Sequence, residues 1–336
     1  MSTLKEILVH KNITCQSVWF MRQAGRYLPE FRQIRIQNKN FIDLCLNSSL
    51  SSEITLQPIK RFDLDSAIIF SDILLVPYAL GQKVEFIKNQ GPILSEFRIE
   101  KFLENTEVIF KEKLNPIYRA ITITRKRLRE EKSLIGFIGA PWTLLVYMLG
   151  LKENKNKINI EDFKKQEQNM NLILNNLINY LCIHIEEQVN AGVDVIQIFD
   201  SWAGLLPDKS LQKLCFEPNL KIVNFCKRKN IPVICFPKGI REKYQEFCNT
   251  VRPDGINLDY NLDPLWVKEN ITNIALQGGM HPQMLLKSDK EMYSEAEKYL
   301  ETFKDVPYIF NLGHGIVPET KPSKLEKLIQ FIRKQK

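Results

Sequence analysis

The sequence predicts a single (β/α)8 barrel that spans residues 1–336. Eight short apolar runs alternate with longer segments in which apolar residues recur at helical spacing. The runs are continuous rather than alternating, as a parallel sheet covered on both faces requires. An open doubly wound sheet is the competing fold. The count of eight runs and the lack of a Gly-x-Gly-x-x-Gly motif argue against it.

The apolar runs are the expected barrel strands, and they cover residues 18–20, 67–70, 134–139, 193–199, 232–236, 255–258, 274–277 and 308–312. Helical periodicity predicts helices over residues 41–61, 115–131, 162–190 and 321–333, and a shorter one entered through Pro141. Residues 84–87 are expected to belong to a hairpin insertion. In a barrel of this type the loops after the strands build the active site.

Composition limits the possible partners. Lys and Arg outnumber Asp and Glu by 47 to 39, which gives a net charge of +8. This surplus fits nucleic acid, a membrane surface, a polyanionic small molecule or no partner at all. No basic stripe with interleaved aromatic residues is present, so we expect no nucleic acid. No long apolar stretch or signal peptide appears, so we expect no membrane contact and a cytoplasmic location.

Cysteine and histidine spacing argues against a metal. The chain has seven cysteines, an odd number, without a Cys-x-x-Cys pair, which favours reduced thiols over disulfides or a zinc site. No His-Glu-x-x-His motif or similar ligand cluster is present. We therefore expect no metal.

Two arginines follow the first apolar run. Arg22 and Arg26 lie four residues apart with Gly25 between them, and Pro29 prevents a helix from continuing through the segment. Guanidinium groups at the end of a strand form a fork that suits carboxylates or phosphates. Surface salt bridges are the alternative for such arginines. Gly25 is expected to let the backbone turn or approach a ligand closely.

Other polar residues follow later strands. Asp72 is pressed against apolar neighbours, although an Asp here also caps helices. Tyr147 is either a core aromatic or a site residue, and Ser201 either caps a helix or bonds substrate, because no Gly-x-Ser-x-Gly elbow surrounds it. His314 lies between two glycines, which let a ligand come close. We expect one mouth to gather Arg22, Arg26, Asp72, Ser201, Lys238, Asp259 and His314.

Five segments, in order along nearly the whole chain, resemble the uroporphyrinogen decarboxylase family. They are FMRQAGRYLPE at 20–30, FSDIL at 70–74, GAPWTL at 139–144, IFDSWAG at 198–204 and NLGHGI at 311–316. The first and the last are highly specific. The chain departs from the family pattern at Gly279, His281 and Pro237, and the roles of His281 and Lys238 stay open.

The resemblance implies a cofactor-free, cytoplasmic homodimer that converts uroporphyrinogen III to coproporphyrinogen III. It implies that Asp72 and Arg22 are catalytic and that Asp72 stabilises a protonated pyrrole. The substrate-binding residues that it implies are Arg22, Gln23, Ala24, Gly25, Arg26, Phe41, Asp72, Tyr147, Ser201 and His314. The identity of the general acid stays open among Arg22, His314 and a held water.

Two other functions are compatible with the same barrel. A zinc- and corrinoid-dependent methyltransferase would need a His-x-Cys pair and a distant Cys, whereas Cys182 and His184 stand in the reverse order inside a predicted helix. A non-catalytic tetrapyrrole-binding protein would fit the positive charge and would bind without releasing CO2.

Overall fold

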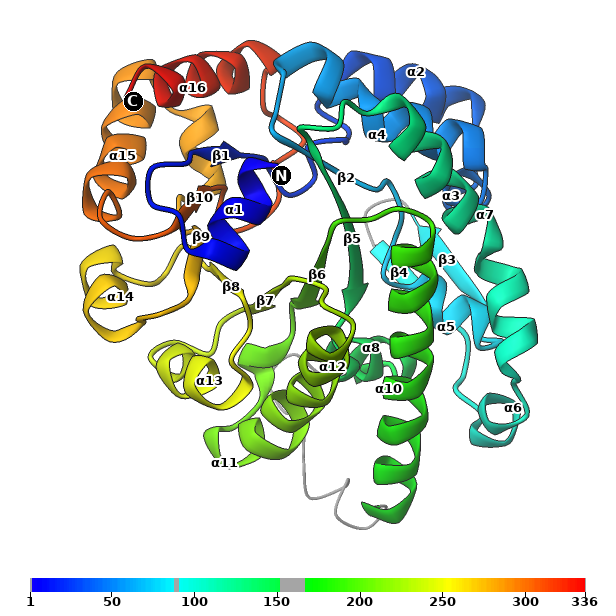
Figure 1. Ribbon diagram of the computed structural model, residues 1–336. Helices are drawn as coiled ribbons and strands as arrows, with labels where there is room; N and C mark the ends of the chain where they lie inside the picture. The colour runs from blue at the N-terminus through cyan, green and yellow to red at the C-terminus, as the bar shows by residue number, and fades with distance from the viewer. Residues whose placement is uncertain (1, 88–90, 152–166, 336) are drawn as a thin grey trace.

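The computed structural model describes residues 2–87, 91–151 and 167–335. Eight parallel strands form a nearly closed barrel surrounded by helices (Figure 1), as the sequence predicts. The strands are β1 (Ser17–Val18), β2 (Ser66–Ile68), β5 (Ser133–Gly139), β6 (Val195–Asp200), β7 (Val233–Pro237), β8 (Gly255–Leu258), β9 (Ala275–Gly278) and β10 (Tyr308–Phe310). Their order is β1-β10-β9-β8-β7-β6-β5-β2.

The seam between β1 and β2 is closed by single contacts rather than by a ladder. The backbone N–H of Asp65 donates to the Val18 carbonyl at 3.1 Å, and Val18 N–H donates to the Asp65 carboxylate at 2.7 Å. The second carboxylate oxygen of Asp65 accepts from Arg333 at 2.8 Å. This side chain therefore ties the first two strands to the last helix.

Helices connect consecutive strands and form the outer layer. The longer ones are α1 (Thr3–His10), α2 (Pro29–Gln37), α4 (Ser48–Phe62), α7 (Glu107–Arg127), α8 (Pro141–Met148), α10 (Glu167–Asn190), α12 (Glu217–Arg228), α13 (Lys243–Val251), α15 (Asp289–Thr302) and α16 (Pro322–Lys334). The shorter ones are α3 (Phe41–Cys45), α5 (Leu75–Ala79), α6 (Ile99–Leu103), α11 (Asp208–Leu211) and α14 (Pro264–Asn270). Three further helical turns cover Ala203–Leu205, Gln212–Phe216 and Pro282–Leu286.

Two predicted helices differ from the structure. The helix expected over 41–61 is split into α3 and α4, because the Asn47 side chain accepts the Leu50 N–H and starts a new helix. The helix expected over 115–131 begins earlier, at Glu107, where Thr106 caps it, and it ends at Arg127. The predicted start at residue 162 lies outside the described residues, and α10 confirms the remainder of that helix.

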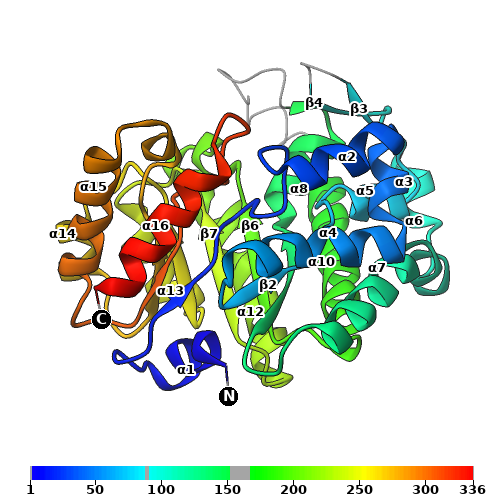
Figure 2. The ribbon, with the colours of Figure 1, turned by 90° about the horizontal axis from the view of Figure 1, so that it is seen from above.

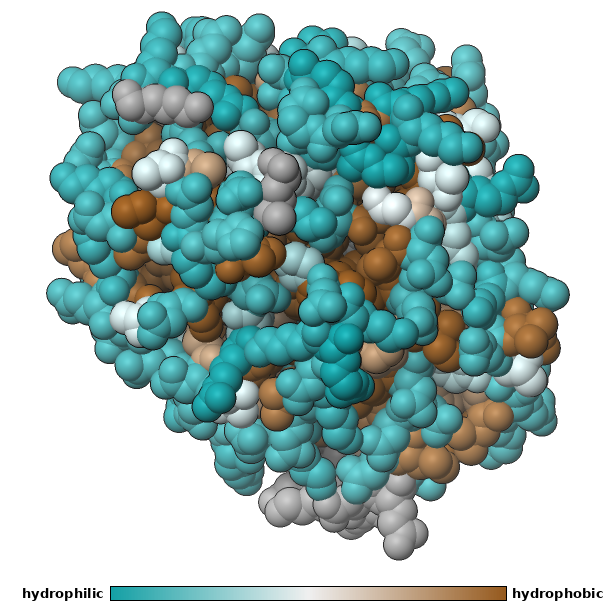
Figure 3. Space-filling view, viewed as in Figure 1, coloured by the Kyte–Doolittle hydropathy of each residue, from teal (hydrophilic) through white to brown (hydrophobic). Residues whose placement is uncertain are grey.

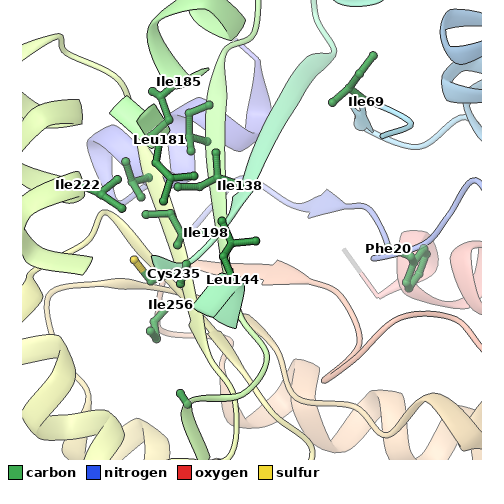
Figure 4. Packing of buried hydrophobic residues seen from close by; sticks show 14 of the residues in the cluster. Phe20, Ile69, Ile138, Leu144, Leu181, Ile185, Ile198, Ile222, Cys235 and Ile256 are labelled. Carbon is green, nitrogen blue, oxygen red and sulfur yellow. The ribbon is translucent and has the colours of Figure 1, made fainter. Parts of the chain in front are cut away.

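The larger hydrophobic core lies between the barrel and its helices. Figure 4 shows residues of successive strands packed against α8, α10 and α12. The labelled strand residues include Ile138, Ile198, Cys235 and Ile256, and the helix residues include Leu144, Leu181, Ile185 and Ile222. All of them are almost completely buried, so the outer face of the sheet is covered by these helices.

A second core fills the barrel itself and is closed at one end by α1. Leu4, Ile7 and Leu8 of this helix join the cluster that contains Trp19 and Ile309. Figure 2 shows α1 at one end of the barrel and the hairpin of β3 (Val84–Ile87) and β4 (Gly91–Leu94) at the other. The face around α1 is mainly hydrophilic on the outside (Figure 3). Because the chain runs from α1 into β1, the strands terminate at the end opposite α1.

Candidate active site

The arginine segment leaves β1 at the C-terminal end of the barrel and is tied to the loop after β10. The backbone N–H of Met21 donates to the side chain of Asn311 at 3.1 Å, and the Ile316 N–H donates to the Met21 carbonyl at 2.9 Å. These bonds bring Arg22 beside the segment that carries His314. Two of the resembling segments, almost three hundred residues apart, thus form one wall.

Arg22 has an unusual backbone conformation, with a φ of 60°. Non-glycine residues in this region are uncommon and are held there by their surroundings. A methyl group on Gly315 would lie 2.4 Å from Cδ of Arg22, so a glycine is needed for the arginine side chain to pass. Of the two roles expected for Gly25, the structure shows the backbone turn. A Cβ there would lie 3.0 Å from the Arg22 carbonyl oxygen, so the close approach is to backbone.

The segment residues that follow Arg22 divide into supporting and exposed groups. The Gln23 side chain is fully buried, donates to the Ser66 carbonyl at 3.0 Å and accepts from the Phe20 N–H at 3.1 Å. It therefore holds the segment onto β2. Ala24 is partly exposed, and Arg26 is exposed. Neither Arg22 nor Arg26 forms an ion pair with a carboxylate of the described residues.

Asp72 lies in the loop between β2 and α5. One carboxylate oxygen accepts the Leu74 N–H at 2.9 Å, so the predicted local capping bond is present. The other oxygen accepts no hydrogen bond from the described residues. Burial raises the pKa of Asp72 to about 6, and the charge of Arg22 opposes that rise. Asp72 is therefore mostly ionised at pH 7, with one oxygen available.

Arg22 is the electrostatic centre of the mouth. Burial is the largest influence on the pKa of Asp72, Tyr147, Lys238 and His314, and the charge of Arg22 acts on each of these groups as well. Arg22 therefore lies near groups from α8 and from the loops after β2, β7 and β10. Of the residues expected at one mouth, Asp72, Lys238 and His314 are thus within the electrostatic reach of Arg22.

Two of the aromatic side chains have a defined protonation state at neutral pH. Burial lowers the pKa of His314 to about 3, and the nearby charges of Lys238 and Arg22 add to this effect. The imidazole is therefore neutral at pH 7. Burial likewise raises the pKa of Tyr147, which keeps its hydroxyl protonated. The Tyr147 ring stands edge-on to that of Trp202, with centroids 6.0 Å apart.

Ser201 is held in place by its buried neighbour Asp200. The Asp200 carboxylate accepts from the Thr143 hydroxyl at 2.7 Å, and the same hydroxyl accepts the Trp202 N–H at 3.1 Å. Asp200 also accepts from Asn219 at 3.2 Å. Ser201 is partly exposed, and its hydroxyl forms no hydrogen bond with a described residue. The hydroxyl is therefore free to bond a ligand.

Phe41 lies outside the group around Arg22. Its ring is 5.9 Å from that of Phe70 and 4.6 Å from that of Phe86, and the guanidinium of Arg35 lies over it at 5.5 Å. Phe70 is two residues before Asp72 in the chain. Phe41 thus packs beside the Asp72 loop, between that loop and the hairpin.

Comparisons with known proteins agree with the five segments. The family model described as uroporphyrinogen decarboxylase matches residues 1–335. The chain belongs to the uroporphyrinogen decarboxylase family. Proteins named uroporphyrinogen decarboxylase are similar along almost their whole length. The protein of Orientia tsutsugamushi is 38% identical over 99% of this chain and 98% of its own, and that of Jannaschia sp. is 39% identical over 94% of each.

Solved structures agree on the fold. A methyltransferase from Methanosarcina mazei has a TM-score of 0.75 at 16% identity and covers 99% of this chain, while 98% of that protein is matched. A B12-independent methionine synthase from Shewanella sp. has a TM-score of 0.56 at 11% identity, with coverage of 86% of this chain and 88% of its own. At these identities the likeness concerns the barrel alone.

The alternative metal chemistry has no counterpart in the described part of the chain. Within residues 2–87, 91–151 and 167–335, no three His, Cys, Asp or Glu side chains come together in a way that would hold a metal. His184 is buried, and its Nδ1 lies 3.0 Å from the Tyr118 hydroxyl. His281 also has a structural partner, since its Nδ1 accepts the Gln283 N–H at 3.1 Å.

Among the described residues, no helix has the length and apolar character that a membrane span requires.

Two aromatic residues inside the barrel could not be identified from the sequence of this family member. Phe137 of β5 and Phe199 of β6 pack on the core inside the barrel, remain partly exposed, and have ring centroids 5.7 Å apart. They lie near the ends of their strands and so form an apolar floor beneath the charged mouth. A continuous apolar run does not reveal which residues face inward, so the sequence alone carried no signal for this role.

Proposed function

We propose that this protein is a uroporphyrinogen decarboxylase that converts the four acetate side chains of uroporphyrinogen III to methyl groups and yields coproporphyrinogen III and CO2. The observation that carries the proposal is that the charge of Arg22 acts on the buried carboxylate of Asp72 although the two groups form no ion pair. An unpaired guanidinium and a carboxylate with a free oxygen share one mouth above aromatic residues. A polycarboxylated tetrapyrrole matches all three elements, because it has an acidic rim, central N–H groups and apolar rings.

Decarboxylation requires a place for the electron pair of the C–CO2 bond. A neutral pyrrole accepts electrons poorly, but protonation of the ring carbon beside nitrogen produces an iminium-like cation. The bonding pair then moves into that ring as CO2 leaves. A proton is taken up at the exocyclic carbon to complete the methyl group, and the ring carbon returns the first proton. The net change is one proton gained for each CO2 released.

Asp72 is proposed to stabilise the cation. Its open oxygen is fixed by the Leu74 bond and by burial before any substrate arrives. A charge held in this way needs no reorganisation when positive charge develops, so it favours the transition state over the neutral ground state. One carboxylate facing several pyrrole N–H groups also selects a puckered ring system.

Arg22 and Arg26 are proposed to bind substrate carboxylates. Both guanidiniums lack ion-pair partners in the described part of the chain, and a guanidinium offers several N–H donors in a planar fork. Charge-assisted hydrogen bonds are worth about 1.5–3 kcal/mol each. The acetate that reacts must lie away from the strongest positive charge, because its own charge disappears in the transition state.

The pKa of His314 reduces the number of candidates for the proton donor. His314 has a pKa of about 3, so it is a neutral hydrogen-bonding group at pH 7 rather than an acid. An arginine keeps its proton too firmly to be an efficient donor. A water held at the mouth fits the remaining requirements. Tyr147, Ser201 and His314 are proposed to contact the tetrapyrrole.

We also propose one catalytic domain over residues 1–336, a cytoplasmic setting and a homodimer. The family model supports the first point because it covers residues 1–335. All seven cysteines are free, which is compatible with a reducing compartment. The homodimer rests on the family resemblance and is tested by light scattering.

The decisive experiment supplies uroporphyrinogen III to the purified protein, with and without a metal chelator, and follows CO2 and the porphyrin products. We expect CO2 and coproporphyrinogen under both conditions, and near-abolition in Asp72→Asn. Absence of CO2 release from the wild type would overturn the assignment. An absolute requirement for metal would favour the methyltransferase-like alternative, and full activity of Asp72→Asn would remove the proposed mechanism.

A further inference from the structure

Lys238 is a cation at the mouth without a protein partner. It follows β7 directly and its side chain is partly buried. No carboxylate or other acceptor among the described residues lies within ion-pairing or hydrogen-bonding distance of its Nζ. Buried or partly buried charges in proteins are normally paired. An unpaired ammonium in this position is therefore suited to an anion that arrives from outside.

The backbone of Lys238 is fixed from both sides. Its N–H donates to the Asp200 carbonyl at 3.1 Å, and its carbonyl accepts the Gly204 N–H at 2.9 Å. The next residue, Gly239, donates its N–H to the Asp259 carboxylate at 2.8 Å. The loops after β6 and β8 thus hold the turn that carries the lysine, so its side chain starts from a defined point on the rim.

The charged groups around Lys238 act on it only at a distance. Burial lowers the pKa of Lys238, Asp259 raises it, and Arg22 lowers it again. Lys238 in turn contributes to the lowered pKa of His314. Asp259 does not neutralise the lysine by a direct contact, and its second oxygen accepts the Asn261 N–H at 2.9 Å. Lys238 therefore lies close enough to Arg22 for the two charges to influence each other, and neither forms an ion pair with a carboxylate of the described residues.

We propose that Lys238 is a third substrate-binding cation, and that it binds a carboxylate which remains on the product. This inference rests on the proposed function for the identity of the substrate. The neighbourhood of two cations stabilises an ionised carboxylate, which disfavours loss of its charge as CO2. Lys238 consequently holds a propionate rather than the acetate that reacts. A lysine, as a rotatable point charge, also follows a substrate that turns between successive reactions.

The test compares Lys238→Met with Lys238→Arg. Methionine keeps an unbranched side chain of similar length without the charge, and arginine restores the charge. Lys298→Met is the matched control, because Lys298 is an exposed residue of α15 and the substitution changes the net charge equally. Binding is measured with uroporphyrin, which keeps its acetates, and with coproporphyrin, in which they are methyls, through quenching of tryptophan fluorescence. KM and kcat are measured with uroporphyrinogen.

We expect Lys238→Met to bind both porphyrins about tenfold more weakly, the change that one lost charge-assisted hydrogen bond produces. KM should rise by a similar factor while kcat stays within about threefold. Lys238→Arg should recover most of the affinity, and Lys298→Met should match the wild type. Equal losses for the two porphyrins identify a carboxylate that they share.

Three results would overturn the inference: unchanged affinity in Lys238→Met, no recovery in Lys238→Arg, or a loss confined to uroporphyrin. Thermal melts establish that each variant is folded, and Lys238→Gln takes the place of Lys238→Met if the latter melts early. The binding measurement does not require turnover. A wild type that binds both porphyrins but releases no CO2 therefore refutes the proposed function and leaves the assignment of Lys238 to be decided by binding.

Discussion

Asp72 and Asp200 are two carboxylates with the same pKa and different surroundings. Burial raises the pKa of each to about 6. Asp200 is 1% exposed, and both of its oxygens accept hydrogen bonds, from Thr143 and Asn219 among others. Asp72 is partly exposed and uses one oxygen, for the Leu74 N–H. One carboxylate is fully engaged within the protein, and the other is open on the side of the mouth.

A raised pKa does not by itself identify a catalytic group, because Asp72 and Asp200 share it. Burial alone produces the shift at both positions. What distinguishes Asp72 is an unbonded oxygen and the nearby charge of Arg22. What distinguishes Asp200 is a set of neutral donors that join β6 to α8 and α12. The first group is arranged to meet a ligand, and the second is arranged to position the Ser201 loop.

The largest expected effect separates the two residues by activity. Asp72→Asn should lower kcat by about two to three decades, because removal of a preorganised charge-stabilising group costs roughly 3–4 kcal/mol of transition-state stabilisation. Asp200→Asn, equal in size and in charge change, should lower kcat by less than about tenfold. Initial rates of CO2 release at pH 8 measure both. Similar losses in the two variants would break the distinction.

The second prediction concerns the free energy of unfolding, which should respond differently to alanine substitution of Asp200 and of Asp72. Asp200→Ala leaves the Thr143 hydroxyl and one N–H of the Asn219 amide without an acceptor in the core, which should lower the free energy of unfolding by about 2–4 kcal/mol. Asp72→Ala removes a buried charge and strands only the Leu74 N–H, so its stability at pH 8 should equal or exceed that of the wild type. Urea unfolding gives both values. A strong loss in Asp72→Ala would mean that its carboxylate stabilises the fold.

The pH dependence sharpens the assignment of Asp72. Its pKa in the folded protein, about 6, lies above that of an unfolded Asp, about 3.9. The folded state therefore binds the proton more tightly, and stability falls as pH rises from about 4 to 6. Activity has the opposite trend, because protonation below pH 6 removes the anion. We expect kcat/KM to have an acidic limb near pH 6.

Arg22 provides the control for that limb. Its charge holds the pKa of Asp72 below the value that burial alone would give, so Arg22→Met should move the acidic limb to higher pH. The same variant should leave the pKa of Asp200 unchanged, because Arg22 is not among the groups that act on it. Rate profiles from pH 5 to 9 measure the first effect. A limb that stays in place would show that Asp72 does not sense Arg22.

The smallest effect concerns the bond between Asp200 and Thr143. Thr143→Val removes a hydroxyl that donates to Asp200 and accepts from Trp202, so we expect a loss of about 1–2 kcal/mol in stability and a few-fold fall in kcat. Thr143→Ser keeps the hydroxyl and should retain both bonds. Melting temperature and initial rate are the measurements. If Thr143→Val and Thr143→Ser behaved alike, the Thr143 hydroxyl would contribute neither to stability nor to activity.

The barrel and several loops of the mouth can be predicted from the sequence, because their signals lie in short contiguous segments. Each strand is a continuous apolar run that ends in a polar or glycine residue, so the strands and the loops that carry Asp72, Ser201 and His314 are visible without coordinates. The break between α3 and α4 is less visible, because apolar periodicity continues across the Asn47 cap. Apolar periodicity indicates which face of a helix is buried, but it does not indicate a break that depends on one capping hydrogen bond.

The finer features of the site depend on contacts between distant segments. The residue with the positive φ is Arg22, whereas the sequence indicated unusual backbone freedom at Gly25. The buried amide of Gln23 reaches β2, which no short-range pattern indicates. The inward orientation of Phe137 and Phe199 depends on the pleat of strands that are apolar on both faces. Such features require the three-dimensional neighbours to be known.

The pairing of the first strand with the last one has a consequence for synthesis on the ribosome. Ser17 is opposite Ile309 in the sheet, so β1 has no ladder partner until residues 308–310 have been made. Contacts of such high sequence separation form slowly, and the N-terminal strand edge stays available to other chains in the meantime. The first strand of the nascent chain therefore stays without its ladder partner until β10 has been synthesised.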